Sequence, residues 1–286
     1  MELEIRNLSK TYSGGVKALQ GIEMRIGQGM FGLLGPNGAG KSTLMRTIAT
    51  LQEADRGEIL LDGTDVLHNH DHIRRILGYL PQEFGLYDDM TTRQMLMHIA
   101  MLKGITSRSD RKRAAEHIMQ QTNLHQHRNR KLGQFSGGMK QRFGIAQALL
   151  GDPRLIIVDE PTAGLDPEER NRFYNILSAI SEDRIVILST HIVEDIRVLC
   201  QHMAVLHQGQ LLFSGSTEEA LAGLKGRIWQ RIITKEEIQH FGDYNIILTR
   251  MMGGRILLHV LSEKEIPGFS PVEPDLEDVY FHLIRN

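Results

Sequence analysis

Cysteine is nearly absent from this chain of 286 residues, and tryptophan also occurs only once. With a single cysteine, Cys200, the chain has neither a disulfide framework of its own nor a metal site built from several cysteines. We expect the Cys200 thiol to pack as a small apolar group rather than to act as a nucleophile.

Long apolar runs and an excess of one charge are missing as well. No uninterrupted apolar stretch approaches the roughly 20 residues that a membrane span needs. Residues 1–6 alternate charged and apolar side chains and lack the core of a signal peptide. The formal net charge of −2 gives no overall basic excess for binding nucleic acid. These absences favour a cytoplasmic protein, in which any membrane role needs a separate partner chain.

The most informative segment present is a glycine-rich loop, GPNGAGKST, at residues 35–43. It follows an apolar run at 30–34 and leads into a predicted helix at 44–51, which is the layout of a phosphate-binding loop. Its glycines let successive N–H groups point into one concavity, which binds a polyphosphate together with the positive helix end. Lys41 is expected to contact the β- and γ-phosphates, and the Ser42 hydroxyl to coordinate Mg²⁺.

Two acids, Asp159 and Glu160, directly follow the continuous apolar run 155–158, which is typical of a buried parallel strand. A carboxylate at a strand end holds Mg²⁺ in phosphate-loop proteins, and Asp159 is placed for that role. Glu160 is the candidate for polarising an attacking water. His191 ends the predicted strand 185–190 and is the candidate for holding the water and Glu160 in position. On its own, a histidine at a strand end is more often structural.

A second anion site is predicted where Ser136, Gly137 and Gly138 precede a helical segment. Because the chain has one Mg²⁺-holding acid pair, we expect this second site to serve the nucleotide of a neighbouring molecule. Gln82, at the edge of the helical insertion, could contact Mg²⁺ or the attacking water, although on its own a surface loop glutamine is the better interpretation. The histidine-rich segment 68–72 is interpreted as a solvated loop rather than a metal site.

The pattern along the chain predicts an α/β core with an all-helical insertion. The insertion, about residues 92–150, has helical spacing, with Met95, Ile99 and Leu102 on one stripe. A hairpin is expected around Gln208 and Gly209. Alternating or continuous apolar runs predict strands at residues 2–8, 22–26, 30–34, 58–63, 76–81, 155–158 and 185–188.

From about residue 221 the sequence changes into a smaller appendix. Strands are predicted at residues 246–248 and 256–260, and Gly253 and Gly254 between them are suited to a tight turn. The segment 274–283 is predicted to be a capped helix with an apolar face formed by Leu276, Val279, Tyr280 and Leu283.

Over residues 2–220 these motifs occur together and in one order, and the chain resembles the ATP-binding subunit of an ATP-binding-cassette (ABC) transporter. The resemblance is specific, because seven short motifs occur in the order of the family. The matches are Tyr12 to the adenine-stacking aromatic residue, 35–43 to the Walker A loop, Gln82 to the Q-loop, 136–138 to the signature motif, 155–160 to Walker B, 163–166 to the D-loop and His191 to the switch histidine.

The resemblance implies an α/β fold with a P-loop NTPase (RecA-like) core, an N-terminal antiparallel β subdomain, an inserted α-helical subdomain at about 90–150 and a small α+β C-terminal extension. It divides the chain into a cassette at 2–220 and an accessory region at 221–286. The implied activity is ATP hydrolysis coupled to transport, with ATP and Mg²⁺ as cofactors.

The resemblance also implies roles for individual residues. The catalytic residues would be Lys41, Gln82, Glu160 and His191. The metal ligands would be Ser42, Gln82 and Asp159. The nucleotide would be bound by Tyr12, Gly35, Pro36, Asn37, Gly38, Ala39, Gly40, Lys41, Ser42, Thr43, Ser136, Gly137, Gly138 and Asp166.

The implied partners are a membrane-spanning permease subunit and a second ATP-binding subunit, either another copy or a related chain, in a head-to-tail dimer; no nucleic acid is implied. The subunit would lie on the inner face of the cell membrane. Two positions depart from the usual signature, Phe135 and Met139. A signature ending in methionine resembles the exporter branch with ABC-2-type membrane subunits. The alternative hypothesis is a soluble ABC-type ATPase with an assembly or regulatory role and no membrane partner.

Overall fold

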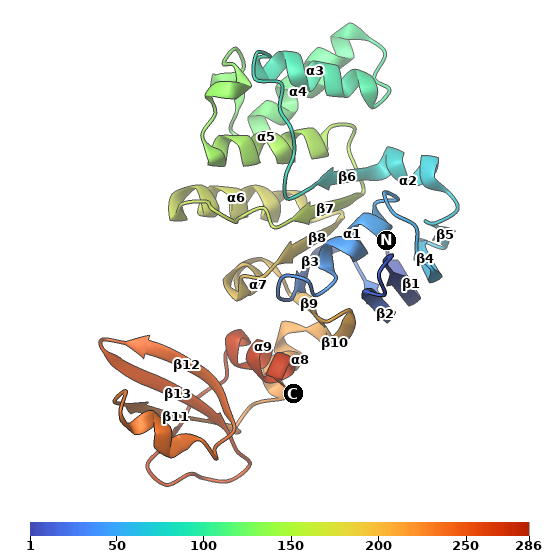
Figure 1. Cartoon of the computed structure of the whole chain (residues 1–286). Coiled ribbons are helices and arrows are strands. Elements are labelled where there is room, and N and C mark those ends of the chain that lie inside the picture. The colour runs from blue at the N-terminus through green and yellow to red at the C-terminus, as the bar shows by residue number, and fades with distance from the viewer. Residues whose placement is uncertain (286) are drawn as a thin grey trace.

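A six-stranded sheet forms the middle of the molecule in the computed structural model, which describes residues 1–285 (Figure 1). Its strand order is β10-β9-β3-β8-β7-β6, and all neighbours are parallel except the β9–β10 pair. The predicted buried strands and the hairpin at Gln208 and Gly209 are confirmed. The strands are β3 (Gly29–Leu34), β6 (Leu77–Leu80), β7 (Leu155–Asp159), β8 (Ile185–Thr190), β9 (His202–His207) and β10 (Gln210–Ser216).

Parallel strands bring the site segments to one edge of this sheet. In register, Val158 pairs with Leu188, Asp159 with Ser189 and Leu34 with Thr190. The carboxyl ends of β3, β7 and β8 therefore meet at the same edge, which is where open α/β sheets bind ligands. The phosphate loop, Glu160 and His191 each follow one of these three strands.

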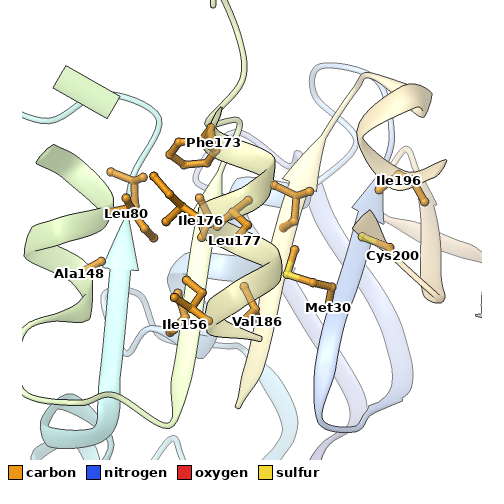
Figure 2. Packing of buried hydrophobic residues seen from close by; sticks show 14 of the residues in the cluster. Met30, Leu80, Ala148, Ile156, Phe173, Ile176, Leu177, Val186, Ile196 and Cys200 are labelled. Carbon is orange, nitrogen blue, oxygen red and sulfur yellow. The ribbon is translucent and has the colours of Figure 1, made fainter. Parts of the chain in front are cut away.

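Helix α6 (Pro167–Ile180) covers one face of the sheet. Its side chains Phe173, Ile176 and Leu177 lie over Ile156 of β7 and Val186 of β8 (Figure 2). These strand residues are fully buried because both sheet faces are covered, which explains why the strands appear in the sequence as continuous apolar runs. The helix begins with a proline in its first turn, a position that proline's fixed φ favours.

Helix α7 (Val193–Leu199) packs directly on β3. Ile196 and Cys200 lie beside Met30 (Figure 2), and a Cβ added at Gly32 would fall 2.3 Å from Ile196 Cδ1. Glycine at this position therefore sets how closely α7 approaches the sheet. Cys200 is 6% exposed, so the expected packing of its thiol is confirmed.

The N-terminal part of the chain forms an antiparallel sheet in the order β2-β1-β4-β5. Leu3 and Ile5 alternate into the core, as the sequence predicted, and a register shift between Ile5 and Leu8 lets Leu8 be buried as well. The second strand is longer than expected and begins at Lys17. The segment interpreted as a polar histidine loop contains a short helix, α2 (His70–Ile76), which buries Ile73. The strands are β1 (Leu3–Thr11), β2 (Lys17–Ile26), β4 (Arg56–Leu61) and β5 (Thr64–Asp65).

The insertion between β6 and β7 is helical, as predicted, and lies beyond β6, the outermost strand of the central sheet (Figure 1). It contains α3 (Thr92–Leu102), α4 (Arg108–Gln121) and α5 (Gly137–Leu149), with short 3₁₀ helices η1 (His125–His127) and η2 (Leu132–Gln134). Met95 of the predicted stripe is buried, whereas Leu102 is 70% exposed. The buried face of α3 instead continues through Leu96 and Ala100, and Leu102, the last residue of the helix, points into solvent.

The C-terminal region, residues 221–285, carries a second antiparallel sheet in the order β12-β13-β11-β14. The two predicted strands and their turn at Gly253 and Gly254 are confirmed, while β11 was not predicted. The predicted cassette boundary at 220 falls inside α8 and stays a prediction. The elements are α8 (Thr217–Ala222), β11 (Ile228–Ile233), η3 (Glu237–Phe241), β12 (Ile246–Met252), β13 (Arg255–Leu261), β14 (Ser270–Pro271) and α9 (Leu276–Arg285).

Helix α9 joins the C-terminal sheet to the cassette. It contacts β12 on one side and α7, α8, β9 and β10 on the other (Figure 1). Leu276, Val279 and Tyr280 are buried, as predicted for its apolar face. His259 of β13 lies 2.6 Å from the fully buried Asp278, between ring Nδ1 and carboxylate Oδ1. None of the helices within residues 1–285 is long and apolar enough to cross a membrane.

Candidate nucleotide site

The loop at residues 35–43 borders a cavity of about 630 Å³ at the carboxyl edge of the central sheet. Helix α1 (Lys41–Ile48) begins at the end of this loop. The N-cap Gly40 has no side chain to bond the first N–H groups, which leaves those donors available to a ligand. The cavity is lined by Tyr12, Val16, Lys17, Ala18, the loop residues from Pro36 to Thr43, Gln82, Glu160 and Gln208.

Glycine is required at two positions of the loop. Gly40 has a φ of +105°, and a Cβ there would lie 2.3 Å from the carbonyl oxygen of Ala18. A Cβ at Gly35 would lie 2.4 Å from the carbonyl oxygen of Leu206. The loop is therefore packed against backbone on two sides, so larger residues would push it out of shape.

Lys41 points into the loop and is only 5% exposed. Its ammonium donates hydrogen bonds to the carbonyl oxygens of Gly35 at 2.7 Å and Pro36 at 3.2 Å. Glu160 Oε1 lies 3.4 Å from the same nitrogen. The ammonium is held at the cavity wall by partners that an incoming phosphate can replace.

The acid pair at the end of β7 is buried. Asp159 is 3% exposed, and its Oδ1 accepts a hydrogen bond from the Ser189 hydroxyl on the neighbouring strand. Glu160 is 8% exposed and has a φ of +47°, a conformation that a non-glycine residue rarely adopts. Its N–H donates to the carbonyl of Ser189 at 3.0 Å, which helps to hold this backbone in place. Strain of this kind persists only where the surroundings fix it, and it is common at functional sites.

His191 and Glu160 meet across the ends of two strands. His191 Nδ1 lies 3.1 Å from Glu160 Oε2, and the imidazole is 44% exposed. Glu160 thus contacts Lys41 through one carboxylate oxygen and His191 through the other. Lys41, Glu160 and His191, which are far apart in the sequence, form one connected group beside the cavity.

Tyr12 and Gln82 also reach the cavity wall. Tyr12 Oη lies 3.1 Å from Thr43 Oγ1 and donates to Gln52 Oε1 at 2.7 Å, so its ring is anchored to α1 and the loop that follows. Ser42 is half-buried at the start of α1. The predicted nucleotide-contacting residues on this side of the chain therefore surround one space.

Ser136, Gly137, Gly138 and Asp166 are not among the residues that line this cavity in the described part of the chain. Ser136 caps α5 by accepting the N–H of Met139 at 3.3 Å. A Cβ added at Gly137 would meet nothing within 4 Å, so the start of α5 is open on that side. Asp166 caps α6 and accepts the N–H of Glu169 at 2.9 Å. The two predicted anion sites of one chain do not converge.

Sequence reasoning missed four residues of the cavity wall, Val16, Lys17, Ala18 and Gln208. Gln208 arrives through the β9–β10 hairpin, where the N–H of Gly209 donates to the carbonyl of Ala39 at 2.9 Å. No local pattern marks these residues, because only the packing of the hairpin and β2 against the loop places them here.

The family model described as "ABC transporter" matches residues 19–163, which span the phosphate loop, Gln82, the signature segment and Glu160. The chain belongs to the ABC transporter family. It is an ATP-binding subunit of that family, and it binds and hydrolyses ATP.

Curated relatives include "ABC transporter ATP-binding protein NatA" of Bacillus subtilis, 36% identical over 71% of this chain and 83% of its own. "Linearmycin resistance ATP-binding protein LnrL" of the same organism is 35% identical over 78% of this chain and 72% of its own. "Sulfate/thiosulfate import ATP-binding protein CysA" of Methylococcus capsulatus is 33% identical over 90% of this chain and 73% of its own.

A similar solved structure is the dimer of the ATP-binding cassette MJ0796 in a post-hydrolysis state with ADP and Pi. It is 27% identical, covers 75% of this chain and 98% of its own, and superimposes with a TM-score of 0.68. The P-loop NTPase fold with an N-terminal antiparallel subdomain and a helical insertion is confirmed.

Proposed function

We propose that this subunit powers export through a separate membrane-spanning permease and lies against that permease on the inner face of the cell membrane. The observation that carries the proposal is the cavity bordered by the phosphate loop, with Lys41 and Glu160 3.4 Å apart at its wall. The name of LnrL contains the word resistance, and Met139 ends the signature as in the exporter branch. The name of CysA contains the word import, so direction is part of what must be tested.

For hydrolysis, Glu160 would polarise the attacking water, and His191, 3.1 Å away, would hold that carboxylate and the water in line. Lys41 would leave its carbonyl partners and neutralise charge on the transferring phosphoryl group. Because the imidazole of His191 is exposed, a second subunit that binds at this edge can contact it.

The oxygens of Ser42 and Asp159, together with Gln82, would hold Mg²⁺. Hydroxyl, carboxylate and amide oxygens are the ligands this hard cation prefers. Asp159 fits the role because it is buried and one of its oxygens is oriented by the Ser189 hydroxyl. When bound, the ion supplies charge neutralisation at the β- and γ-phosphates.

We propose a head-to-tail dimer, because the two anion sites of one chain do not converge. Ser136, Gly137 and Gly138 of one copy would bind the γ-phosphate held by the loop of the other copy, and Asp166 would lie at the same interface. Tyr12 would stack on the adenine. Support for this arrangement comes from the open start of α5 and from the dimeric structure of MJ0796.

Exposed apolar side chains support docking to a membrane partner. Tyr87, in the loop after Gln82, is 65% exposed, and Met101 and Leu102 at the end of α3 are 49% and 70% exposed. A permease segment that covers these side chains would bury apolar area and sense movement of the Gln82 loop.

The dimer is tested with the Glu160→Gln variant, which should bind ATP without turning it over. With Mg²⁺ and ATP, light scattering should report twice the monomer mass, and adding Ser136→Arg should abolish this dimer. A variant that binds ATP and stays monomeric would overturn the head-to-tail arrangement.

The membrane partner is tested by isolating the full chain from its native membrane. A multi-span protein should co-purify, and Leu102→Asp should weaken its capture, while the matched change Leu51→Asp at another exposed leucine should not. Capture of no membrane protein would favour the alternative, an assembly or regulatory ATPase. ATP-dependent uptake by reconstituted permease in the importing sense would overturn the proposed direction.

A further inference from the structure

Asp195, in the first turn of α7, is fully buried and bonded to three different segments. Its Oδ2 accepts hydrogen bonds from the hydroxyls of Thr162 at 2.7 Å and Thr190 at 2.6 Å. Its Oδ1 accepts one from the hydroxyl of Tyr174 in α6 at 2.5 Å. Among residues 1–285 no cation forms a salt bridge with this carboxylate, so the three hydroxyls are its partners.

Two of these three donors belong to segments that carry the hydrolytic residues. Thr162 follows Glu160 by two positions, just after the backbone with positive φ. Thr190 directly precedes His191, and its hydroxyl also accepts the N–H of Ile192 at 2.9 Å. The Thr190 side chain thus spans His191 and fixes the backbone on both sides of it.

We propose that Asp195 is a positioning residue for hydrolysis: it ties the segment of Glu160 to the segment of His191 and so sets the 3.1 Å contact between them. This rests on the proposed roles of Glu160 and His191. Within the described residues, Asp195 does not line the cavity and forms no hydrogen bond with Glu160 or His191, so it acts through Thr162 and Thr190.

The bonding pattern explains why a carboxylate stands here. One buried oxygen must accept two hydroxyl donors and the other must accept a third, and an ionised carboxylate is the side chain with that acceptor capacity. Loss of one hydroxyl leaves part of a buried charge unpaired, which costs more than an ordinary hydrogen bond. The strand ends would then shift to compensate, and small shifts of catalytic groups are costly to rate.

The test removes each hydroxyl while keeping the shape of the side chain. In the full chain with Mg²⁺ and ATP, Thr162→Val and Thr190→Val should each lower kcat by roughly 10- to 100-fold, because positioning is lost. The KM for ATP should change by less than about threefold, since the loop that binds the phosphates is untouched. Thr162→Ser and Thr190→Ser keep the hydroxyl and should restore most of the rate.

Thr122→Val is the matched control. Thr122 is also fully buried, and its hydroxyl donates to the carbonyl of Ile118 at the end of α4, away from the strand ends. It should lose some thermal stability, as expected for an ordinary buried hydrogen bond, and keep its kcat. Stability of every variant is measured by thermal unfolding, and assays are run well below the lowest midpoint.

Three results would overturn the proposal. The first is an unchanged kcat in both valine variants together with an inactive Glu160→Gln variant. Glu160 would then keep its role, and Asp195 would have no positioning role. The second is serine variants as slow as the valine variants. The third is a Glu160→Gln variant with the parental rate, which removes the proposed function itself and the positioning role with it.

Discussion

The nucleotide end of the cassette and the C-terminal region both bring polar side chains together, with different consequences. Lys41 and His191 are held by partners that a ligand can replace, and the imidazole is 44% exposed. His259 and Asp278 of the C-terminal region are instead sealed between β13 and α9, with both side chains at least 92% buried. Exchangeable partners suit chemistry, whereas sealed partners suit attachment of one element to another.

The two regions also differ in how their backbones are held. Glu160, which directly follows β7, has a positive φ, and the carbonyl oxygen of Ser189 accepts its N–H. The C-terminal sheet depends on aromatic packing. The ring centroids of Phe241 and Phe269 lie 5.7 Å apart in an edge-to-face arrangement, and the Arg231 guanidinium lies over both rings. We therefore expect single substitutions to separate the two regions, one affecting turnover and the other affecting stability.

The largest separation is expected from Glu160→Gln. Loss of the carboxylate removes the group that polarises the water, so kcat should fall by roughly 10²- to 10⁴-fold while ATP affinity is kept. Steady-state hydrolysis and equilibrium ATP binding measure the two effects. Glu182→Gln, an exposed acid beyond α6, is the control and should keep the parental rate. Equal losses in both variants would contradict the assignment.

The opposite outcome is expected from His259→Ala. It leaves Asp278 buried without its partner, which should destabilise the C-terminal region by about 3–5 kcal/mol. Amide hydrogen exchange should rise in β11, β13 and α9 while β7 and β8 stay protected and hydrolysis persists. His240→Ala, an exposed histidine of η3, should change little. An equal loss of protection from hydrogen exchange in β7 would contradict this expectation, because the two regions would then unfold as one unit.

A smaller effect on the nucleotide end is expected from Lys41→Ala. The ammonium should contribute charge-assisted hydrogen bonds to the phosphates, so its loss should weaken ATP binding by roughly 10- to 100-fold. Calorimetric titration in the presence of Mg²⁺ measures it. Lys112→Ala, an exposed lysine of α4, should bind ATP normally. Unchanged affinity in Lys41→Ala would remove the loop assignment.

The smallest effect at neutral pH concerns Cys200, which packs between α7 and β3. Burial raises the pKa of this thiol to about 12, with the Asp195 charge adding to the effect. The folded pKa is above the unfolded one, so the contribution to stability is complete below the ordinary thiol pKa of 9.0 and is lost as pH rises toward 12.

At pH 7–9 we therefore expect a thiol reagent to react with Cys200 only as fast as the protein opens. An introduced thiol at Val198, which is 50% exposed on the same helix, should react at once. Rapid native-state reaction of Cys200 would mean that α7 separates from β3 more easily than its packing indicates.

Much of the nucleotide end could be predicted from the sequence because its chemistry is local. The phosphate loop lies within nine consecutive residues, and Asp159 and Glu160 are adjacent. The contacts between segments could not be predicted. The 3.4 Å approach of Glu160 to Lys41, the arrival of Gln208 and the burial of Asp195 all depend on strand register and helix packing.

The C-terminal region was less predictable. The turn at Gly253 and Gly254 could be found because a turn of this kind needs positive φ, which glycine adopts readily. Both residues do have positive φ, at +54° and +85°. Strand β11 was missed because it contributes apolar side chains to two clusters. Ile228 packs in the main core and Ile233 packs with Phe241, so the strand lacks the alternation that marks a half-buried strand.

The lone buried cysteine also has a practical consequence. The native thiol is covered and the chain has no other thiol. Cysteines introduced near Ser136 and near the phosphate loop could therefore each carry a spin label without first removing the natural residue. Pulsed resonance measurements on such labels would report the separation of the two half-sites directly, in each nucleotide state, on an otherwise unaltered molecule.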